Sequence, residues 1–214
     1  MEWGVLFVVV LGVALGFIVL QATFAARHWR RVIGQGDVGA LQEALDEAFD
    51  HWRSRRPPRG FPPADWQALQ SAALVAADRD RCRVSLLAGV DVRVVGHRHE
   101  QVGSEVDVGR RVAVMMVERL LYEIPHVRFD AVQVDVYAQH RDRDGTPRQQ
   151  CVLTTQVTRV LAQVSDWDVA TPAEMLEEWD TREAAPGQPL EPDEGALIAS
   201  DQPGAVLSLN GAYS

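Results

Sequence analysis

The feature that most restricts this chain is a long uncharged run at its N-terminus. From Trp3 to Leu20 the sequence reads WGVLFVVVLGVALGFIVL, and the six residues that follow, up to Ala26, add only one amide and one hydroxyl. A helix rises about 1.5 Å per residue, so such a run can cross a hydrocarbon core of about 30 Å. The sequence predicts a single transmembrane helix within residues 1–26.

The residues that flank this run favour a membrane anchor over a cleaved signal peptide. The acid Glu2 precedes the run, where a signal peptide carries positive charge, and Thr23-Phe24-Ala25 is only a weak cleavage sequence. Three bases follow the run, namely Arg27, Arg30 and Arg31. Because cytoplasmic flanks are enriched in bases, we expect an N-terminus outside the cell membrane and a cytoplasmic soluble domain.

Four residues near or inside the run predict how it sits in the bilayer. Trp3 and Trp29 are placed to lie at the two interfaces, where indole rings are enriched. Gly12 and Gly16 have the G-x-x-x-G spacing that lets two helices pack closely. Glycine is also frequent in such spans without a packing role, so both interpretations remain open.

Charge is distributed unevenly along the 214 residues, whose formal net charge is −9. The chain up to Ser165 contains 19 acids and 20 arginines, whereas the remainder contains 11 acids and only Arg182. An acidic surface repels nucleic acid, so we expect no nucleic-acid partner. From residue 184 to 214, proline, glycine and acids predominate, which predicts a weakly structured acidic tail.

Residue types needed for several chemistries are missing. The chain has no lysine, which excludes Schiff-base and P-loop mechanisms. Cys82 and Cys151 are too far apart for C-x-x-C chemistry, and we expect two buried thiols. The sequence has no G-x-S-x-G or H-E-x-x-H motif. We therefore expect a protein that is not an enzyme and that has no cofactor.

Residues 27–63 are predicted to connect the anchor to the soluble domain. Apolar residues recur at helical spacing from Val38 to Trp52, with acids on the opposite side, which predicts an amphipathic helix. The stretch from Arg53 to Gly60 is basic and rich in proline, as in a linker near a membrane surface.

Residues 64–183 are predicted to form a small α+β domain. Its expected elements are a helix capped by Asp65, a strand over 83–95, a helix over 107–124, strands over 127–139 and 149–161, and a helix over 171–180. The two later strands form a hairpin around Asp144-Gly145, and Thr171 begins a capping box. The order β-α-β-β-α resembles ring-building and KH-like modules of membrane-anchored secretion and sporulation proteins.

Two groups of residues could begin a metal site. His97, His99 and Glu100 follow the first predicted strand, and a ligand set would be completed if His126, His140 or an acid converged on them. A solvated turn is the simpler interpretation. Asp135 on one strand and Gln156-Val157-Thr158 on the next are similar to the D…(E/Q)-x-K pattern of restriction-endonuclease-like nucleases. Thr158 replaces the lysine, so this resemblance implies an inactive relative that retains only Asp135.

These observations favour a non-enzymatic, single-pass accessory or scaffold subunit of a membrane protein complex. Its expected partners are the lipid bilayer and other membrane-protein subunits or copies of itself. Two alternatives remain open. The first is a ring-forming oligomerisation module, and the second is a membrane-tethered metal-dependent hydrolase or inactive nuclease-like domain that uses Asp135 with the His97 and His99 loop.

Overall fold

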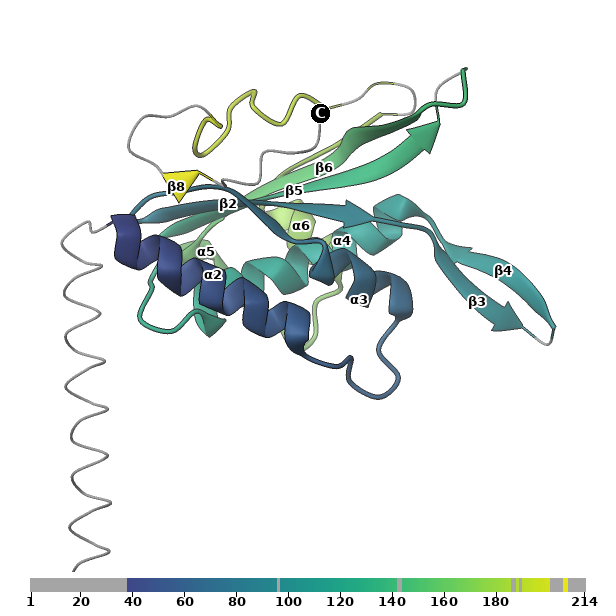
Figure 1. Ribbon diagram of the computed structural model, residues 1–214, viewed down its shortest axis with the longest axis horizontal. Helices are drawn as coiled ribbons and strands as arrows, with labels where there is room; N and C mark the ends of the chain where they lie inside the picture. Colours follow the sequence, from purple (N-terminus) through teal and green to yellow (C-terminus); the bar gives the residue numbers. More distant parts are fainter. Residues whose placement is uncertain are drawn as a thin grey trace, which may run out of the picture.

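The computed structural model describes residues 38–95, 97–141, 144–185, 188, 190–200 and 206–207. These residues form an α+β domain built on one six-stranded sheet, with helices on one face (Figure 1). The elements, in chain order, are α2 (Val38–Ser54), α3 (Pro63–Gln70), β1 (Ala73–Ala77), β2 (Arg81–Ala88), β3 (Asp91–Val95), β4 (Arg98–Gly103), α4 (Glu105–Glu118), the π-helix η1 (Arg119–Glu123), β5 (Ala131–Arg141), β6 (Pro147–Thr158), α5 (Arg159–Val164), α6 (Pro172–Glu178), β7 (Asp180–Glu183) and β8 (Val206–Leu207).

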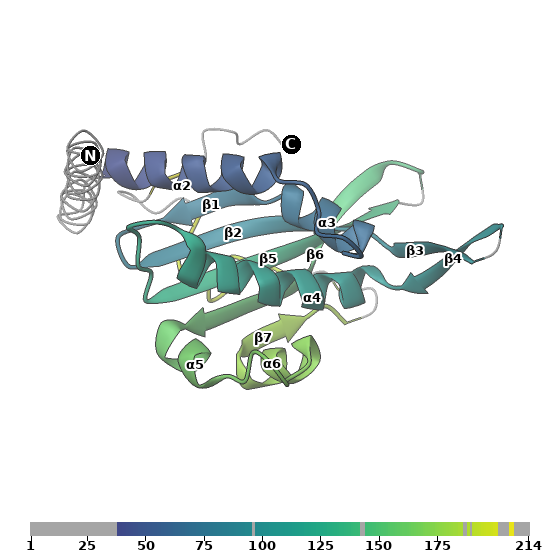
Figure 2. The same ribbon diagram turned by 90° about the horizontal axis from the view of Figure 1, so that it is seen from below.

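The sheet has the strand order β7-β6-β5-β2-β1-β8. Only β2 and β5 are parallel, with Val84 opposite Val134, and every other pair of neighbouring strands is antiparallel. A parallel pair needs a crossover, and here the crossover contains β3, β4 and α4. The β3–β4 pair is a separate two-stranded sheet that projects from one end of the domain (Figure 1, Figure 2).

The apolar core lies between the sheet and the helices α2, α3 and α4 (Figure 2). Alternate residues of β2 and β5, including Val84 and Val134, face the helices and are fully buried. Gly109 lets α4 approach the sheet, because a Cβ at this position would lie 3.2 Å from Cγ1 of Val136. The amphipathic α2 buries one stripe against this core: Ala40, Leu41, Leu45, Ala48, Phe49 and Trp52.

Polar groups fix the helix ends. Ser104 accepts a hydrogen bond from the amide of Asp107 and begins α4 with a capping box. The capping box predicted at Thr171 is present and begins α6. The buried guanidinium of Arg159 donates to the carbonyls of Phe129 and Leu121, which ties η1 to the start of β5.

The predicted fold class is wrong in its element order. The run predicted as one strand over 83–95 is divided between β2 of the main sheet and β3 of the projecting pair. The helix expected from Asp65 ends at Gln70 and gives way to β1, and Asp65 lies in the first turn of α3, where it accepts from Arg111 instead of capping. The domain also contains β4, β7 and β8, so the order is not β-α-β-β-α.

The prediction of a weakly structured tail is also wrong for residues 190–200. This segment, which we call the C-terminal strap, crosses the face of the sheet opposite the helices (Figure 1). Its Ile198 is fully buried. Local composition predicted disorder, but long-range contacts hold the strap to the sheet.

The predicted membrane span falls outside the part of the chain that the structure describes. None of the described helices is long and apolar enough to cross a membrane. Trp3, Gly12, Gly16 and Trp29 lie outside the described residues, as do the three flanking bases Arg27, Arg30 and Arg31.

Candidate functional site

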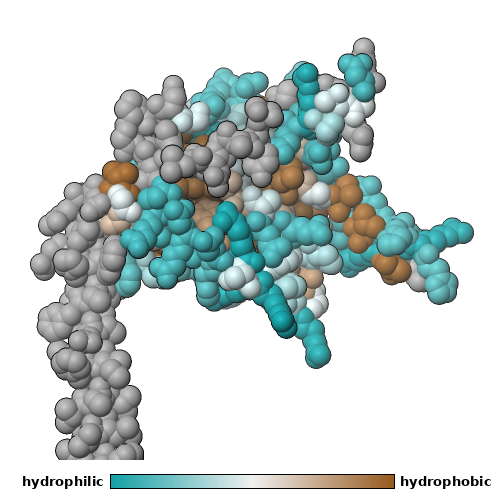
Figure 3. All heavy atoms as spheres, in the orientation of Figure 1, coloured by the Kyte–Doolittle hydropathy of each residue, from teal (hydrophilic) through white to brown (hydrophobic). Residues whose placement is uncertain are grey.

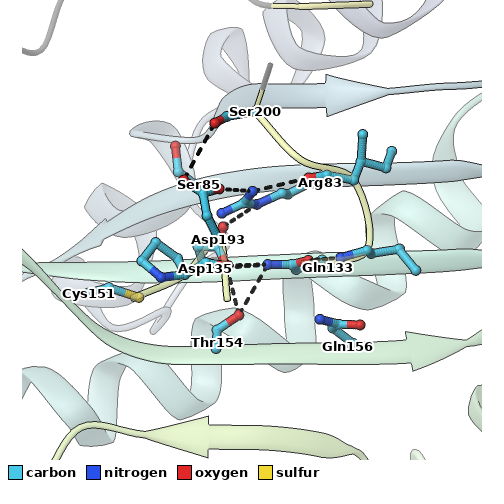
Figure 4. A network of polar contacts seen from close by, with 12 residues as sticks. Arg83, Ser85, Gln133, Asp135, Cys151, Thr154, Gln156, Asp193 and Ser200 are labelled. Atoms are coloured by element: carbon cyan, nitrogen blue, oxygen red, sulfur yellow. Dashed lines mark hydrogen bonds and ion pairs between the residues drawn. The ribbon is translucent and has the colours of Figure 1, made fainter. Parts of the chain in front are cut away.

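A buried polar network lies between the sheet and the C-terminal strap (Figure 4). Asp135 on β5 is fully buried and accepts from Nε of Arg83 at 2.6 Å, from Oγ1 of Thr154 at 2.6 Å and from Nε2 of Gln133 at 2.8 Å. Two parallel strands and one antiparallel neighbour bring these residues together, since Arg83 lies opposite Gln133 and Asp135 lies opposite Thr154.

The C-terminal strap supplies the remaining hydrogen-bond partners of this network. Arg83 also donates to Oδ1 of Asp193 at 2.5 Å and to the carbonyl of Ile198 at 3.1 Å. Gln133 accepts from the amide of Leu197 at 2.7 Å. Burial works against the charge of Arg83, but Asp135 and Asp193 outweigh it and raise the pKa of the guanidinium above its usual value. Arg83 is therefore a charged centre that holds the strap on the sheet.

The polar groups of the network are bonded mainly to one another. Asp135 already accepts three hydrogen bonds, so its oxygens are occupied by donors of the chain itself. Burial, followed by the charge of Asp135, raises the pKa of the nearby thiol of Cys151 to about 12, and the same two causes raise the pKa of Tyr137 to about 12. Both groups are protonated at neutral pH, which leaves no thiolate or phenolate for nucleophilic attack.

The structure does not bring the predicted metal ligands together. His97 and His99 lie exposed on the projecting β3–β4 pair, whereas Asp135 is buried under the strap. Gln156 lies opposite Gln133 and donates to the carbonyl of Gly195, so it also belongs to the strap contact. In the ranges that the structure describes, no group of three or more histidine, cysteine or acidic side chains is placed to hold a metal ion.

The β3–β4 pair, residues 91–103, is a second candidate site, which we call the arm. Its base is anchored by acids and arginines of the domain. Asp65 and Arg111 form a bidentate pair at 2.8 and 2.6 Å, and Arg111 also lies 3.6 Å from the buried Asp91. Gly103 packs on this base, because a Cβ at this position would lie 3.2 Å from Cβ of Asp91. The arm therefore has a fixed attachment and a free outer part.

Valines cover much of the outer part of the arm. Val92 is 42% exposed, Val94 is 65% exposed and Val102 is 49% exposed. Strand alternation places Val92 and Val94 on one face, and Arg93, paired with Glu100, on the other. Hydrophobic residues are visible along the arm in Figure 3. A two-stranded hairpin is marginally stable in water by itself, and this one leaves apolar side chains exposed.

A groove lies between α2 and the residues from the end of η1 onward, Glu123 to His126. We call it the α2–η1 groove. Its volume is about 1120 Å³. Apolar side chains line it from both sides, including Trp52 and Pro125, and so do four acids: Glu43, Glu47, Asp50 and Glu123. Arg119 stacks over the ring of Trp52 at 5.6 Å and joins the two sides.

The α2–η1 groove contains charges of both signs. Of its four acids, Asp50 pairs with Arg53 at 3.1 Å, while Arg55 lines the groove and Arg119 lies over Trp52. Two histidines, His51 and His126, complete the lining. His126 has a φ of 67°, a backbone conformation that non-glycine residues rarely adopt. Backbone outliers of this kind concentrate at binding and switching sites.

Sequence reasoning missed both the arm and the groove. The valines of the arm continue the alternation of β2, so they resemble the buried face of one long strand. A signal was available in Ala88-Gly89-Val90, where glycine interrupts the run and the β2 pattern ends. The groove joins residues about 75 positions apart, Glu47 and Glu123 among them, and no local pattern predicts their proximity.

Comparison with known proteins finds no family that matches this chain, no similar curated protein and no similar solved structure.

Proposed function

We propose that this protein is a non-enzymatic accessory or scaffold subunit that works at a membrane, and that its arm holds a partner protein. The observation that carries the proposal is the exposed valine face of the arm. Val92 and Val94 on that face are 42% and 65% exposed, on a two-stranded sheet that no other described strand extends. Burying a valine fully is worth about 1.5–3 kcal/mol, so covering this face supplies a driving force for binding.

The sequence supports a location close to the membrane. Only the eleven residues 27–37 separate the apolar run ending at Ala26 from the first described residue, Val38. A fully extended chain of that length spans at most about 40 Å. If the apolar run is held in a bilayer, the arm reaches only partners that are themselves at that membrane.

The proposal is tested by recovering partners on the tagged full chain in a mild non-ionic detergent. Val94→Asp places a charge on the valine face of the arm and should lower the recovered partner, including untagged copies of the chain, by at least tenfold. A matched control is Val160→Asp, because Val160 on α5 is 74% exposed but lies outside the arm. The control should recover partners as the unmodified chain does.

Two results would contradict the proposal. Equal recovery by the two variants would show that the arm holds no partner. A stoichiometric divalent metal in the purified chain, lost on His99→Ala, would show that the arm carries a metal centre and would overturn the non-enzymatic assignment.

A further inference from the structure

We propose that the end of the domain opposite the arm rests on a lipid bilayer through a surface formed by η1 and α5. We call this surface the α5 face and define it by four exposed side chains: Tyr122, Val160, Val164 and Val169. The inference rests on the membrane location in the proposed function, but it names a second contact, which involves neither the arm nor its partner.

The valines of the α5 face are the most exposed large apolar side chains that the structure describes. Val160 is 74% exposed, Val164 is 77% exposed and Val169 is 79% exposed. Val94 on the arm, by comparison, is 65% exposed. Val160 and Val164 are four residues apart in α5 and therefore lie on the same side of this helix. The only other exposed residue of α5 is Gln163, so the outer side of the helix has no charge.

Aromatic contacts join η1 to α5 in this surface. The ring of Tyr122 lies edge-on to Trp167, with 6.1 Å between the ring centroids, and the guanidinium of Arg159 lies 5.4 Å from the Tyr122 centroid. Nε1 of Trp167 donates to the carbonyl of Ala162 at 2.7 Å, which holds on α5 the turn that carries Val169. The surface thus combines valines with a ring that has a polar hydroxyl, a type of side chain that is enriched at membrane interfaces.

The register of the sheet places α5 and the arm at opposite ends. β6 ends at Thr158, opposite Ala131, the first residue of β5, and α5 follows directly. Ala131 in turn lies opposite Arg81, where β2 begins. From there β2 runs for eight residues to Ala88, a length of about 26 Å at about 3.3 Å per residue, and the arm follows. A bilayer against the α5 face therefore leaves the arm uncovered.

The chain that follows the apolar run enters the domain at the same end as the α5 face. α2 begins at this end in both Figure 1 and Figure 2, and its other end lies toward the arm. There Arg53 donates to the carbonyl of Ala72, immediately before β1, and the start of β1 pairs with the later half of β2. Only residues 27–37 separate the run ending at Ala26 from the start of α2. If the run is held in a bilayer, the α5 face lies at the end of the domain that is tied to it.

The contact is apolar and does not recognise an anionic headgroup. The guanidinium of Arg159 donates to the carbonyls of Phe129 and Leu121, so it is already occupied. Two exposed acids, Asp166 and Asp168, follow α5 and repel anionic lipid. The expected occupant is therefore a zwitterionic bilayer, with burial of apolar side chains as the attraction. Because the apolar run and the α5 face belong to one chain, the contact forms at a high effective concentration, and a small surface suffices.

Fluorescence quenching in nanodiscs tests the contact on the full chain. An environment-sensitive fluorophore is attached to Val164→Cys, and the chain is placed in phosphatidylcholine nanodiscs in which some lipids carry a spin label near the headgroup. Quenching should be at least threefold greater than for the same fluorophore at Val94→Cys, a matched exposed valine on the arm. The native Cys82 and Cys151 are buried, which keeps the labelling specific.

Charged substitutions supply a second measurement. Val160→Asp combined with Val169→Asp, in the Val164→Cys chain, should lower the quenching at position 164 at least threefold. Val92→Asp combined with Val102→Asp, on the arm, is the matched control and should leave this quenching unchanged. All four positions are exposed, so each chain should keep its fold. Partner recovery in detergent involves no bilayer, so Val160→Asp remains a control in that experiment.

The outcomes separate this inference from the proposed function. A fluorophore at Val10→Cys, within the apolar run, with lipids spin-labelled at the middle of the acyl chain, reports whether the chain enters the bilayer. Quenching at position 10 without greater quenching at position 164 than at position 94 would overturn the α5 contact and leave the proposed function standing. Quenching at position 164 that survives both aspartates would overturn the contact in the same way. Absence of quenching at position 10 would overturn the membrane location and, with it, the proposed function.

Discussion

The C-terminal strap and the arm both leave the regular layers of the domain, but they differ in which side chains they cover. The strap covers charged and polar groups, and Arg83 beneath it is only 2% exposed. The arm exposes apolar groups, and Val94 on it is 65% exposed. Each region is the reverse of the usual arrangement, in which apolar side chains are buried and charged ones face water.

The two regions differ in whether other parts of the chain pair their polar groups and cover their apolar groups. Every polar partner that Asp135 needs comes from β2, β5 and β6 of the same chain, so burial of this charge is compensated. No described segment covers Val92 and Val94, so the apolar surface of the arm is not compensated within the chain. The strap side is therefore a structural contact completed within the chain, whereas the arm leaves apolar surface exposed.

The largest effect on stability is expected for Asp135→Ala. Removing one partner of a buried ion pair leaves a charge without compensation, which typically costs about 3–5 kcal/mol. Arg83 would keep the carbonyl of Ile198 and one acid, Asp193, whose side chain is 59% exposed. Urea unfolding followed by circular dichroism should show this loss in the free energy of unfolding.

A double variant keeps this prediction testable if Asp135→Ala does not fold. Arg83→Met combined with Asp135→Leu removes both charges and fills similar space, and it should be more stable than the single variant by a few kcal/mol. A double variant as unstable as Asp135→Ala would show that the polar network is not the source of the loss.

The parts of the fold that sequence predicted correctly depend on local signals. The amphipathic helix before Trp52, the capping box at Thr171 and the hairpin turn at Asp144-Gly145 are each determined by residues a few positions apart. Gly145 has a φ of 77°, as the predicted turn requires. Such signals act through neighbours in the chain, so a single sequence contains them.

The parts that sequence did not predict depend on distant partners. Asp193 belongs to a segment whose composition indicates disorder, and it is tied to the sheet by Arg83, 110 residues away. Val92 and Val94 alternate as the buried face of a strand does, and alternation cannot show that the chain has left the sheet at Gly89. Of the proposed site, the sequence therefore revealed the residue types but neither the arm nor the groove.

A smaller effect is expected for Asp193→Ala. This variant removes one of the two acids on Arg83 but leaves the buried Asp135 in place, so we expect a loss of about 1–2 kcal/mol after allowance for the exposure of Asp193. Hydrogen exchange at the amide of Leu197, which donates to Gln133, should accelerate as the strap loosens. Glu191→Ala, at another exposed acid of the strap, is the control and should leave the exchange unchanged.

The smallest effect on stability, and the sharpest contrast with the strap, is expected for Val94→Ser. Replacing a core valine of the sheet removes buried apolar area, but Val94 is already largely in contact with water, so the free energy of unfolding should change by no more than about 0.5 kcal/mol. Val134→Ser, at a fully buried position of β5, is the matched comparison and should be destabilised by more than 2 kcal/mol, since it loses apolar burial and buries a hydroxyl. Both are measured by urea unfolding at low protein concentration, where copies are separate. A large loss for Val94→Ser under these conditions would mean that the arm packs on its own chain, and the distinction between a finished strap and an unpartnered arm would fail.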